Sequence, residues 1–404
     1  MKSALKMEGI TKIFPKVIAN DDISIDLKKG QVHAILGEND TGKSTLMNCL
    51  YGLYQPDKGD IYVNEQKVAI KSSEDAINYG IGMVHQHFML IPELTVLENV
   101  ILGIKSKKGP FLDTKFAAKI IKELSKKYNF GINPYDKIMN LSVGMQQRVE
   151  ILKVLYRQAE IFILDEATAV LTPQEVEELF KTIKTLVEEG KSVLIITHKL
   201  EEVMELSQEV TVLRDGKVVG NVLTKNTNPT ELANMMVGRD VLFQYKENKH
   251  KQGRAILQAK SVHMTDKTGV KRLNNITFDL HCGEILGIAG VDGNGQVELS
   301  EVMTGMAKIS DGKIIIKNHE YEDLTPKDAY SEGMSHIPQD RQHTGLVMNL
   351  SIAKNLIITD KRMAPYSNKG VIDYKFVDEH TQKMIKQFAI KAPGADTIVG
   401  ELSG

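Results

Sequence analysis

The sequence contains no tryptophan and only two cysteines, Cys49 and Cys282. Two cysteines so far apart form neither a metal-binding spacing nor a disulfide framework, which suits a reducing cytosol. The N-terminal residues lack the apolar segment of a signal peptide, and no run of about 18 uninterrupted apolar residues occurs anywhere. We therefore expect no membrane-spanning segment. If the protein serves a membrane process, other chains supply the pore.

The sequence also lacks an excess of either charge. Lysine and arginine number 51 against 52 aspartates and glutamates, for a formal net charge of −1. Nucleic-acid-binding proteins usually present a basic face, so this balance gives no reason to expect nucleic acid as a partner. A length of 404 residues is typical of two or three domains.

Two long stretches of the chain repeat each other. The segment from Asp26 to Gly37 resembles the segment from Asp279 to Gly290, and further similarities occur in the same order along both copies. A repeat of this length indicates a duplicated domain. We predict a first domain over residues 1–243, a polar linker over 244–253 and a second domain over 254–404. The residues after Gly144 in the first copy have no counterpart in the second, which suggests a truncated version of a longer protein.

The first copy alternates between short apolar runs and helical patterns. The runs Val32–Leu36, Ile161–Leu164 and Val193–Ile196 are typical of buried parallel strands, and residues 175–189 carry apolar side chains at helical spacing before Gly190. This alternation predicts an α/β fold with a largely parallel sheet.

A glycine-rich segment follows the first of these strands. The segment Gly37-Glu-Asn-Asp-Thr-Gly42-Lys43-Ser44 fits the phosphate-binding pattern G-x-x-x-x-G-K-[ST] between a strand and a helix. Its amides form an anion nest, Lys43 would reach the β- and γ-phosphates, and the Ser44 hydroxyl would bind Mg²⁺. Asp40 is unexpected here, because its carboxylate either weakens nucleotide binding or points to solvent. The predicted nucleotide contacts of this loop are Gly37, Glu38, Asn39, Asp40, Thr41, Gly42, Lys43, Ser44 and Thr45.

Polar residues also follow the other two strands. Asp165 would hold Mg²⁺, and Glu166 could polarise the attacking water as a general base. His198 follows the strand that ends at Ile196, at the edge where ligands of open α/β sheets gather, and we favour a γ-phosphate contact over a purely structural role.

The segment Leu141-Ser-Val-Gly-Met-Gln-Gln-Arg148 lies between these motifs. Ser142 can cap the following helix and leave N–H groups free for an anion. A helix cap alone does not explain why this segment stands between a phosphate loop and an Asp-Glu pair.

Together these residues resemble the ATP-binding-cassette (ABC) ATPases, P-loop NTPases in which two cassettes enclose two ATP molecules head to tail. The resemblance implies ATP and Mg²⁺ as cofactors, with Phe14 stacking on adenine and Gln86 sensing Mg²⁺ and the membrane subunit. It also implies that the signature residues Ser142, Gly144 and Gln147 contact the nucleotide of the opposite cassette. The catalytic set is then Glu166, His198, Lys43 and Gln86, and the metal ligands are Ser44, Gln86 and Asp165. Residues 169–172 match the loop that joins the cassettes, and Ala167 and Asp40 depart from the family pattern.

The second phosphate loop, Gly290 to Val297, keeps its glycines but has Gln296 in place of lysine and Val297 in place of serine or threonine. Without these groups we expect weak nucleotide binding and little hydrolysis there. The intact first loop needs the second signature, which stops at Gly404. The chain as written is therefore not expected to complete its better site.

The resemblance extends to importers of nucleosides and simple sugars, through residues 169–174, Met235–Arg239 and, for the nucleoside branch, residues 83–89. It implies a transport ATPase at the cytoplasmic face of the membrane, with permease subunits and an extracellular solute-binding protein as partners. Two alternatives stay open. One is a soluble tandem ATPase acting on ribosomes or nucleic acid, which the short linker and balanced charge disfavour. The other is a non-functional remnant.

Overall fold

The computed structural model describes residues 2–15, 17–38, 41–86, 88–104, 113–238, 253–266, 268–291, 293–359 and 364–402. The chain divides into two compact units, Met1–Gln244 and Tyr245–Gly404, which are described separately. Among the described residues, every helix is too short or too polar to traverse a bilayer.

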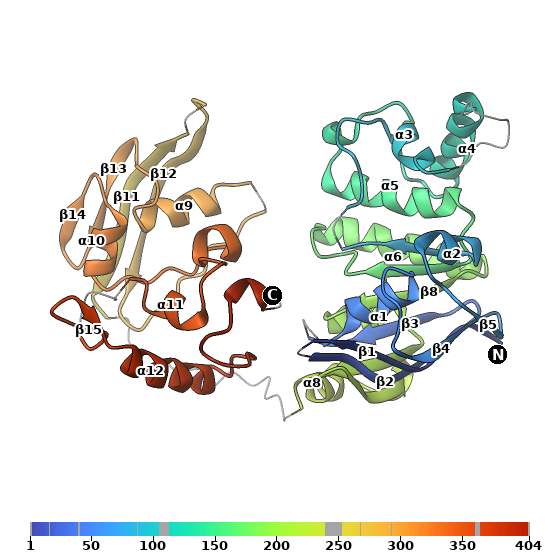
Figure 1. Ribbon diagram of the computed structural model, residues 1–404. Coiled ribbons are helices and arrows are strands. Elements are labelled where there is room, and N and C mark those ends of the chain that lie inside the picture. The colour runs from blue at the N-terminus through green and yellow to red at the C-terminus, as the bar shows by residue number, and fades with distance from the viewer. Residues whose placement is uncertain are drawn as a thin grey trace. The chain divides into compact units, whose positions relative to one another are not determined.

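Unit 1 contains two sheets and eight α-helices within its described residues (Figure 1). Its elements are, in chain order, β1 (Ser3–Phe14), β2 (Val17–Lys28), β3 (Val32–Leu36), α1 (Lys43–Leu50), β4 (Lys58–Val63), β5 (Gln66–Val68), α2 (Ser73–Asn78), β6 (Ile81–Val84), α3 (Val96–Ile101), α4 (Thr114–Lys127), α5 (Val143–Tyr156), β7 (Ile161–Asp165), α6 (Pro173–Glu188), β8 (Ser192–Thr197), α7 (Leu200–Leu206), β9 (Glu209–Arg214), β10 (Lys217–Leu223) and α8 (Pro229–Val237).

The larger sheet has the strand order β10-β9-β3-β8-β7-β6, and only the β9–β10 pair is antiparallel. The predicted parallel strands are therefore confirmed. Every residue of β3, β6, β7 and β8 is buried, because both faces of the sheet are covered. In β3, Val32, Ala34 and Leu36 face one apolar core and Ile35 faces another.

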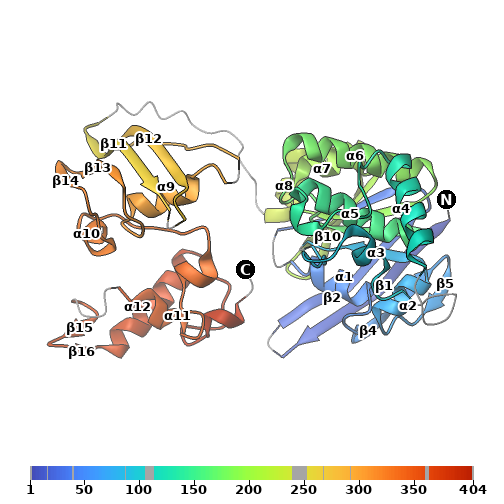
Figure 2. The ribbon, with the colours of Figure 1, turned by 90° about the horizontal axis from the view of Figure 1, so that it is seen from above.

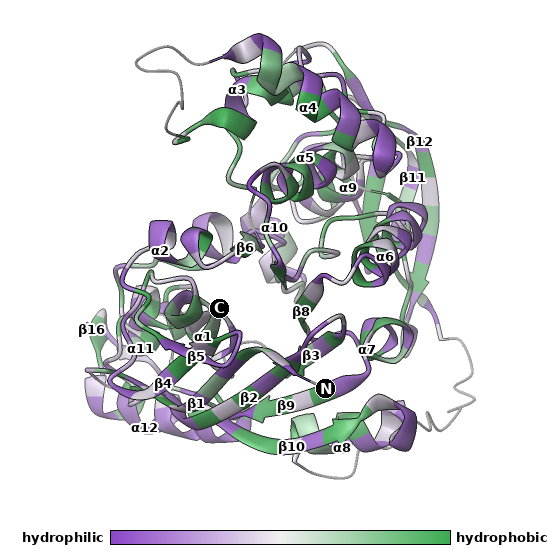
Figure 3. Cartoon of the chain, turned by 90° about the vertical axis from the view of Figure 1, so that its right-hand side faces the viewer, coloured by the Kyte–Doolittle hydropathy of each residue, from purple (hydrophilic) through white to green (hydrophobic). Residues whose placement is uncertain are grey.

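The two cores occupy opposite faces of this sheet. One face packs against helices, and Figure 2 shows α6 and α7 next to each other on the side of unit 1 away from β1, β2 and β4. The other face packs against α1 and the antiparallel sheet β2-β1-β4-β5. Hydrophobic and hydrophilic residues alternate along β1, β2 and β4 (Figure 3), as expected of strands with one buried face. Helices α3, α4 and α5 form a separate group at the far end of unit 1 (Figure 1).

Helix α6 begins earlier than the sequence pattern predicts. It starts at Pro173 rather than Glu175, because Thr172 and Glu175 form a reciprocal capping box and proline is favoured in the first turn. It ends at Glu188, shortly before Gly190.

Unit 2 repeats part of this arrangement: its sheet β12-β11-β13-β14 has the topology of β2-β1-β4-β5. Its elements are β11 (Ala255–Thr265), β12 (Lys271–His281), α9 (Gln296–Met303), β13 (Asp311–Ile316), β14 (His319–Tyr321), α10 (Pro326–Ser331), α11 (Ile352–Leu356), β15 (Ser367–Asn368), β16 (Val371–Ile372) and α12 (Tyr374–Gln387).

The counterparts of β3 and β6 in unit 2 are not strands. Ile285 is 99% exposed and Ile337 is 91% exposed, whereas their matches in unit 1, Val32 and Val84, are buried. In unit 1, β3 pairs with β8 and β9, and β6 pairs with β7. Within the described residues of unit 2, neither of the two matching segments pairs with a strand.

Candidate functional site

The phosphate loop connects β3 to α1 and is fixed by close backbone packing. Gly42 has φ 91°, and a Cβ at this position would lie 2.2 Å from the carbonyl oxygen of Ala19. The Nδ2 group of Asn20, a fully buried residue of β2, donates to the carbonyl oxygen of Gly42 at 3.0 Å. Asn20 could not be predicted from the sequence, since a single asparagine in a strand carries no motif. Its hydrogen bond fixes the backbone of the residue that precedes α1.

Lys43 lies along the inside of this loop. Its ammonium donates to the carbonyl oxygens of Gly37 at 2.9 Å and Glu38 at 2.6 Å, and the residue is 5% exposed. The Thr41 hydroxyl donates to the same Glu38 carbonyl at 2.9 Å. The loop thus holds the cation at the N-terminus of α1, a combination that suits a polyphosphate. Asn39 and Asp40 lie outside the described residues.

Substitution of Gly42 by alanine should distort this loop and abolish measurable binding of ATP. The positive φ costs a non-glycine residue about 1 kcal/mol. The added Cβ would also clash with the Ala19 carbonyl oxygen, and only a movement of the backbone could relieve this clash. Gly131→Ala is a matched control, because Gly131 also has positive φ but a Cβ there meets nothing within 4 Å. Urea unfolding and calorimetric titration with ATP would compare them. Equal effects of the two variants would contradict the packing argument.

The acidic pair follows β7. Asp165 is 5% exposed and lies beside Ser44, whose hydroxyl is hydrogen-bonded to it, while its Oδ1 atom has no hydrogen-bond partner among the described residues. Burial, and then the charge of Glu166, raise the pKa of Asp165 to about 6, and nearby Lys43 opposes the shift. An orphaned carboxylate oxygen next to a hydroxyl fits a hard cation such as Mg²⁺.

Glu166 is held by side chains from the neighbouring strand ends. Gln86 Nε2 donates to its Oε2 at 2.9 Å, and His198 Nδ1 lies 3.2 Å from its Oε1. The Glu166 side chain is 12% exposed and has φ 46°, and its amide is fixed by the Ile196 carbonyl at 2.9 Å. The three predicted residues therefore form one cluster at the carboxyl ends of β6, β7 and β8.

An aromatic pair lies at the end of β1. The rings of Phe14 and Tyr54 meet edge to face with centroids 5.5 Å apart, and the Lys12 ammonium lies 5.7 Å from the Phe14 centroid. Asp57 ties this region down by accepting from the Ile13 amide at 2.7 Å. Tyr54 was not predicted from the sequence, because its partner lies far away along the chain.

The signature segment caps α5 as expected. The Ser142 hydroxyl accepts from the Met145 amide at 3.3 Å. Gly144 is buried against Glu175, whose carboxylate would lie 2.0 Å from a Cβ at this position. Gln147 is placed differently from Ser142: it is 2% exposed and lines a cavity between α5 and α6. Gln147 is thus buried between α5 and α6, whereas Ser142 is exposed.

The second phosphate loop matches the first at the glycine that precedes its helix. Gly295 has φ 94°, close to that of Gly42, and α9 begins at Gln296. Gln296 Nε2 donates to the Val291 carbonyl at 3.1 Å, as Lys43 does to the matching carbonyl of Glu38. The amide replaces the hydrogen bond of the lysine but not its charge.

Comparison with known proteins matches both repeats to one family. The model of the ABC transporter family matches residues 20–169 and 273–404. The guanosine import ATP-binding protein NupO of Bacillus subtilis is 44% identical over 100% of this chain and 79% of its own length. The nucleoside import ATP-binding protein NupA of Lactococcus lactis subsp. cremoris is 41% identical over 100% of this chain and 80% of its own length. A galactose/methyl galactoside import ATP-binding protein of Clostridium perfringens is 36% identical over 99% of this chain and 77% of its own length.

Among solved structures, the ADP conformation of an ATP-binding cassette of an ABC transporter matches with a TM-score of 0.53 and 26% identity, over 59% of this chain and 100% of that one. The predicted cassette fold and its duplication are confirmed. The chain belongs to the ABC transporter family and is an ATP-binding cassette protein.

Proposed function

We propose that this family member is the ATP-hydrolysing subunit of an importer that brings nucleosides into the cell. The observation that carries the ATPase assignment is the meeting of Lys43, Ser44, Asp165 and Glu166 at one edge of the larger sheet. The nucleoside assignment is supported by relatives named for nucleoside and guanosine import. The chain would act at the cytoplasmic face of the membrane with permease subunits and a solute-binding protein.

In this proposal the phosphate loop binds the triphosphate of ATP. The Lys43 ammonium exchanges its loop carbonyls for phosphate oxygens, and the exposed amides at the start of α1 contribute the rest of the anion site. Ser44 and Asp165 would hold Mg²⁺, which when bound neutralises developing charge on the phosphates. Burial of Asp165 makes its carboxylate a stronger ligand, because an unpaired buried charge gains most from a cation.

Glu166 then orients the attacking water and accepts its proton. Gln86 and His198 each engage one carboxylate oxygen, so the side chain is fixed before substrate arrives. Gln86 also connects this carboxylate to the loop after β6, through which the permease would be sensed. His198 is 43% exposed, which leaves one face of its ring open towards the γ-phosphate.

Phe14→Ala should weaken ATP binding roughly 5- to 150-fold, the effect of losing about 1–3 kcal/mol of stacking on a base. Inorganic triphosphate has no base and should bind Phe14→Ala as well as the unchanged chain. Phe14→Tyr should restore the affinity for ATP. Competition calorimetry would measure all three. Equal losses for ATP and triphosphate would show that Phe14 does not contact the base.

Vesicle transport tests the proposed cargo. The chain would be coexpressed with the permease and solute-binding protein of its own organism and reconstituted into vesicles. We expect labelled guanosine to accumulate only with ATP on the side of this chain, and excess galactose not to compete. Competition by galactose or glucose instead would assign the importer to sugars. Accumulation that does not depend on the chain would overturn the proposal.

A further inference from the structure

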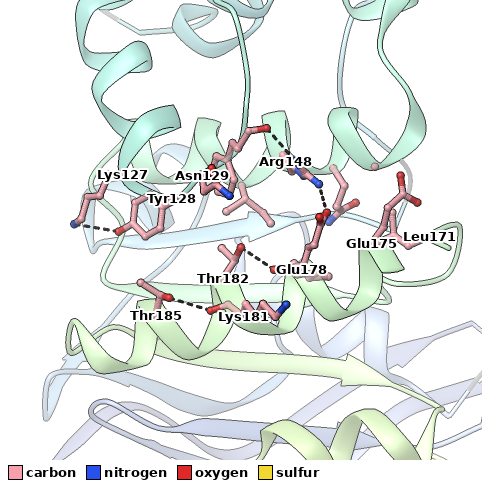
Figure 4. A pocket seen from close by; sticks show the side chains of 15 residues that line it. Lys127, Tyr128, Asn129, Arg148, Leu171, Glu175, Glu178, Lys181, Thr182 and Thr185 are labelled. Atoms are coloured by element: carbon pink, nitrogen blue, oxygen red, sulfur yellow. Dashed lines mark hydrogen bonds and ion pairs between the residues drawn. The ribbon is translucent and has the colours of Figure 1, made fainter. Parts of the chain in front are cut away.

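A cavity of about 300 Å³ opens in unit 1 between α5 and α6, bounded on a third side by the residues that follow α4 (Figure 4). None of the phosphate-loop or acidic-pair residues lines it. It borders the signature at Gly144 and the predicted cassette-joining loop at Leu171. Its volume is at the lower end of the range for small-molecule sites.

Gln147 supplies an unsatisfied donor to this cavity. Its side chain is 2% exposed, and Nε2 has no hydrogen-bond partner among the described residues. Buried amide groups nearly always have a partner. The preceding residue shows the usual outcome, since Gln146 Nε2 donates to the Leu141 carbonyl at 3.0 Å. The Nε2 group of Gln147 therefore lacks a partner in the described part of the chain because the side chain faces the cavity, and not because it lies on α5.

Lys181 supplies a second donor, from α6. Its ammonium makes no hydrogen bond or ion pair within the part of the chain that the structure describes, and the residue lines the cavity. The remaining charged groups around the cavity have partners: Arg148 pairs with Glu178, Glu175 caps α6, and Lys127 pairs with the residue that caps the C-terminus of α6. Within the described part of the chain, three polar side chains at the cavity thus have unused hydrogen-bonding groups: the buried amide donor of Gln147, the exposed amide of Asn129 and the ammonium of Lys181.

A buried amide donor and an exposed ammonium at the same cavity favour a ligand that is rich in acceptor oxygens and negatively charged. Two threonines of α6, Thr182 and Thr185, donate their hydroxyls to their own helix, so their oxygens can still accept from a ligand hydroxyl. We propose that the cavity is a binding site for a small hydroxylated anion, such as a sugar phosphate or a hydroxy acid. A molecule bound there contacts both α5 and α6. It thereby links the signature helix to the helix that follows the cassette-joining loop.

The test is calorimetric titration of the full chain with ribose 5-phosphate, with uncharged ribose as the control ligand. We expect ribose 5-phosphate to bind at one site and ribose to bind at least about tenfold more weakly, because the charge-assisted bonds are lost. Lys181→Met and Gln147→Leu should each weaken ribose 5-phosphate about tenfold or more. Lys184→Met is the matched control. This lysine lies on the same helix outside the cavity and pairs with Glu205, and its replacement should change the affinity less than about twofold.

Lys43→Ala distinguishes binding in the cavity from binding at the phosphate loop. This variant should bind ribose 5-phosphate as well as the unchanged chain does. Lys181 is exposed, so its replacement is expected to leave the fold intact even if Gln147→Leu disturbs it. If inorganic phosphate also binds, and Lys181→Met weakens its affinity to the same degree, the site is supported and the phosphate group alone is recognised. Ribose binding as tightly as its phosphate, loss of binding in Lys43→Ala only, or no binding at about 10 mM would each overturn the proposal.

Discussion

Glu166→Gln should reduce ATP hydrolysis by roughly 10²- to 10⁴-fold, the usual contribution of a positioned general base. Glutamine keeps the size of the side chain and an oxygen that can accept from Gln86 Nε2, so the local geometry should survive. It cannot take a proton from water. ATP affinity should therefore stay within a few-fold of the unchanged chain, and the variant should accumulate bound, uncleaved ATP.

Phosphate release and filter binding of labelled ATP, on the full-length protein assembled with its permease, would measure the two effects separately. Glu160→Gln is a suitable control, because Glu160 precedes β7 whereas Glu166 follows it, and its side chain is mostly exposed. The control should hydrolyse ATP at the normal rate. Normal hydrolysis by Glu166→Gln would remove this carboxylate from the mechanism.

The proximity of the residues that we propose for the ATP site could be predicted, because their positions follow from local sequence and from one rule of sheet geometry. A phosphate loop can be recognised from eight consecutive residues. The polar groups that follow parallel strands must lie at one edge of the sheet. Glu166 and His198 therefore lie together, as the pattern indicated. Ser142 was predictable as a cap for the same local reason.

The supporting residues could not be predicted, because their role depends on chain segments far away in sequence. Asn20 reaches the carbonyl of Gly42 from a different strand, and Tyr54 meets Phe14 only through the fold of the antiparallel sheet. Gln147 is part of a signature motif, yet packing between α5 and α6 sets its environment.

In unit 2, the formation of a whole strand depends in the same way on segments that are distant in the sequence. Residues 285–289 repeat the apolar character of β3 but do not form a strand, because a strand needs hydrogen-bonding neighbours that local sequence cannot provide. Similar sequence thus gives a buried strand in one unit and an exposed segment in the other.

Asp165→Asn should stabilise the nucleotide-free chain while abolishing its response to Mg·ATP. The pKa of Asp165 rises from 3.8 to about 6, so the folded state disfavours the ionised carboxylate. The folded chain then binds more protons than the unfolded chain between these values, and stability falls as the pH rises through that window. At pH 8 the full penalty applies. This rise in the pKa of Asp165 to about 6 corresponds to about 3 kcal/mol, which the neutral amide removes.

Urea unfolding at pH 8 and pH 5 would measure this gain, which should be smaller at pH 5 because part of the carboxylate is then protonated in the folded chain. Asp378→Asn, at an exposed position of α12, should change neither value. Adding Mg·ATP should raise the stability of the unchanged chain but not that of Asp165→Asn, which has lost the charge that attracts the cation. A variant less stable than the unchanged chain at pH 8 would show that the buried charge is compensated. A site that is destabilised when empty and stabilised when filled links binding of the nucleotide to the rigidity of β7, the strand that also positions Glu166.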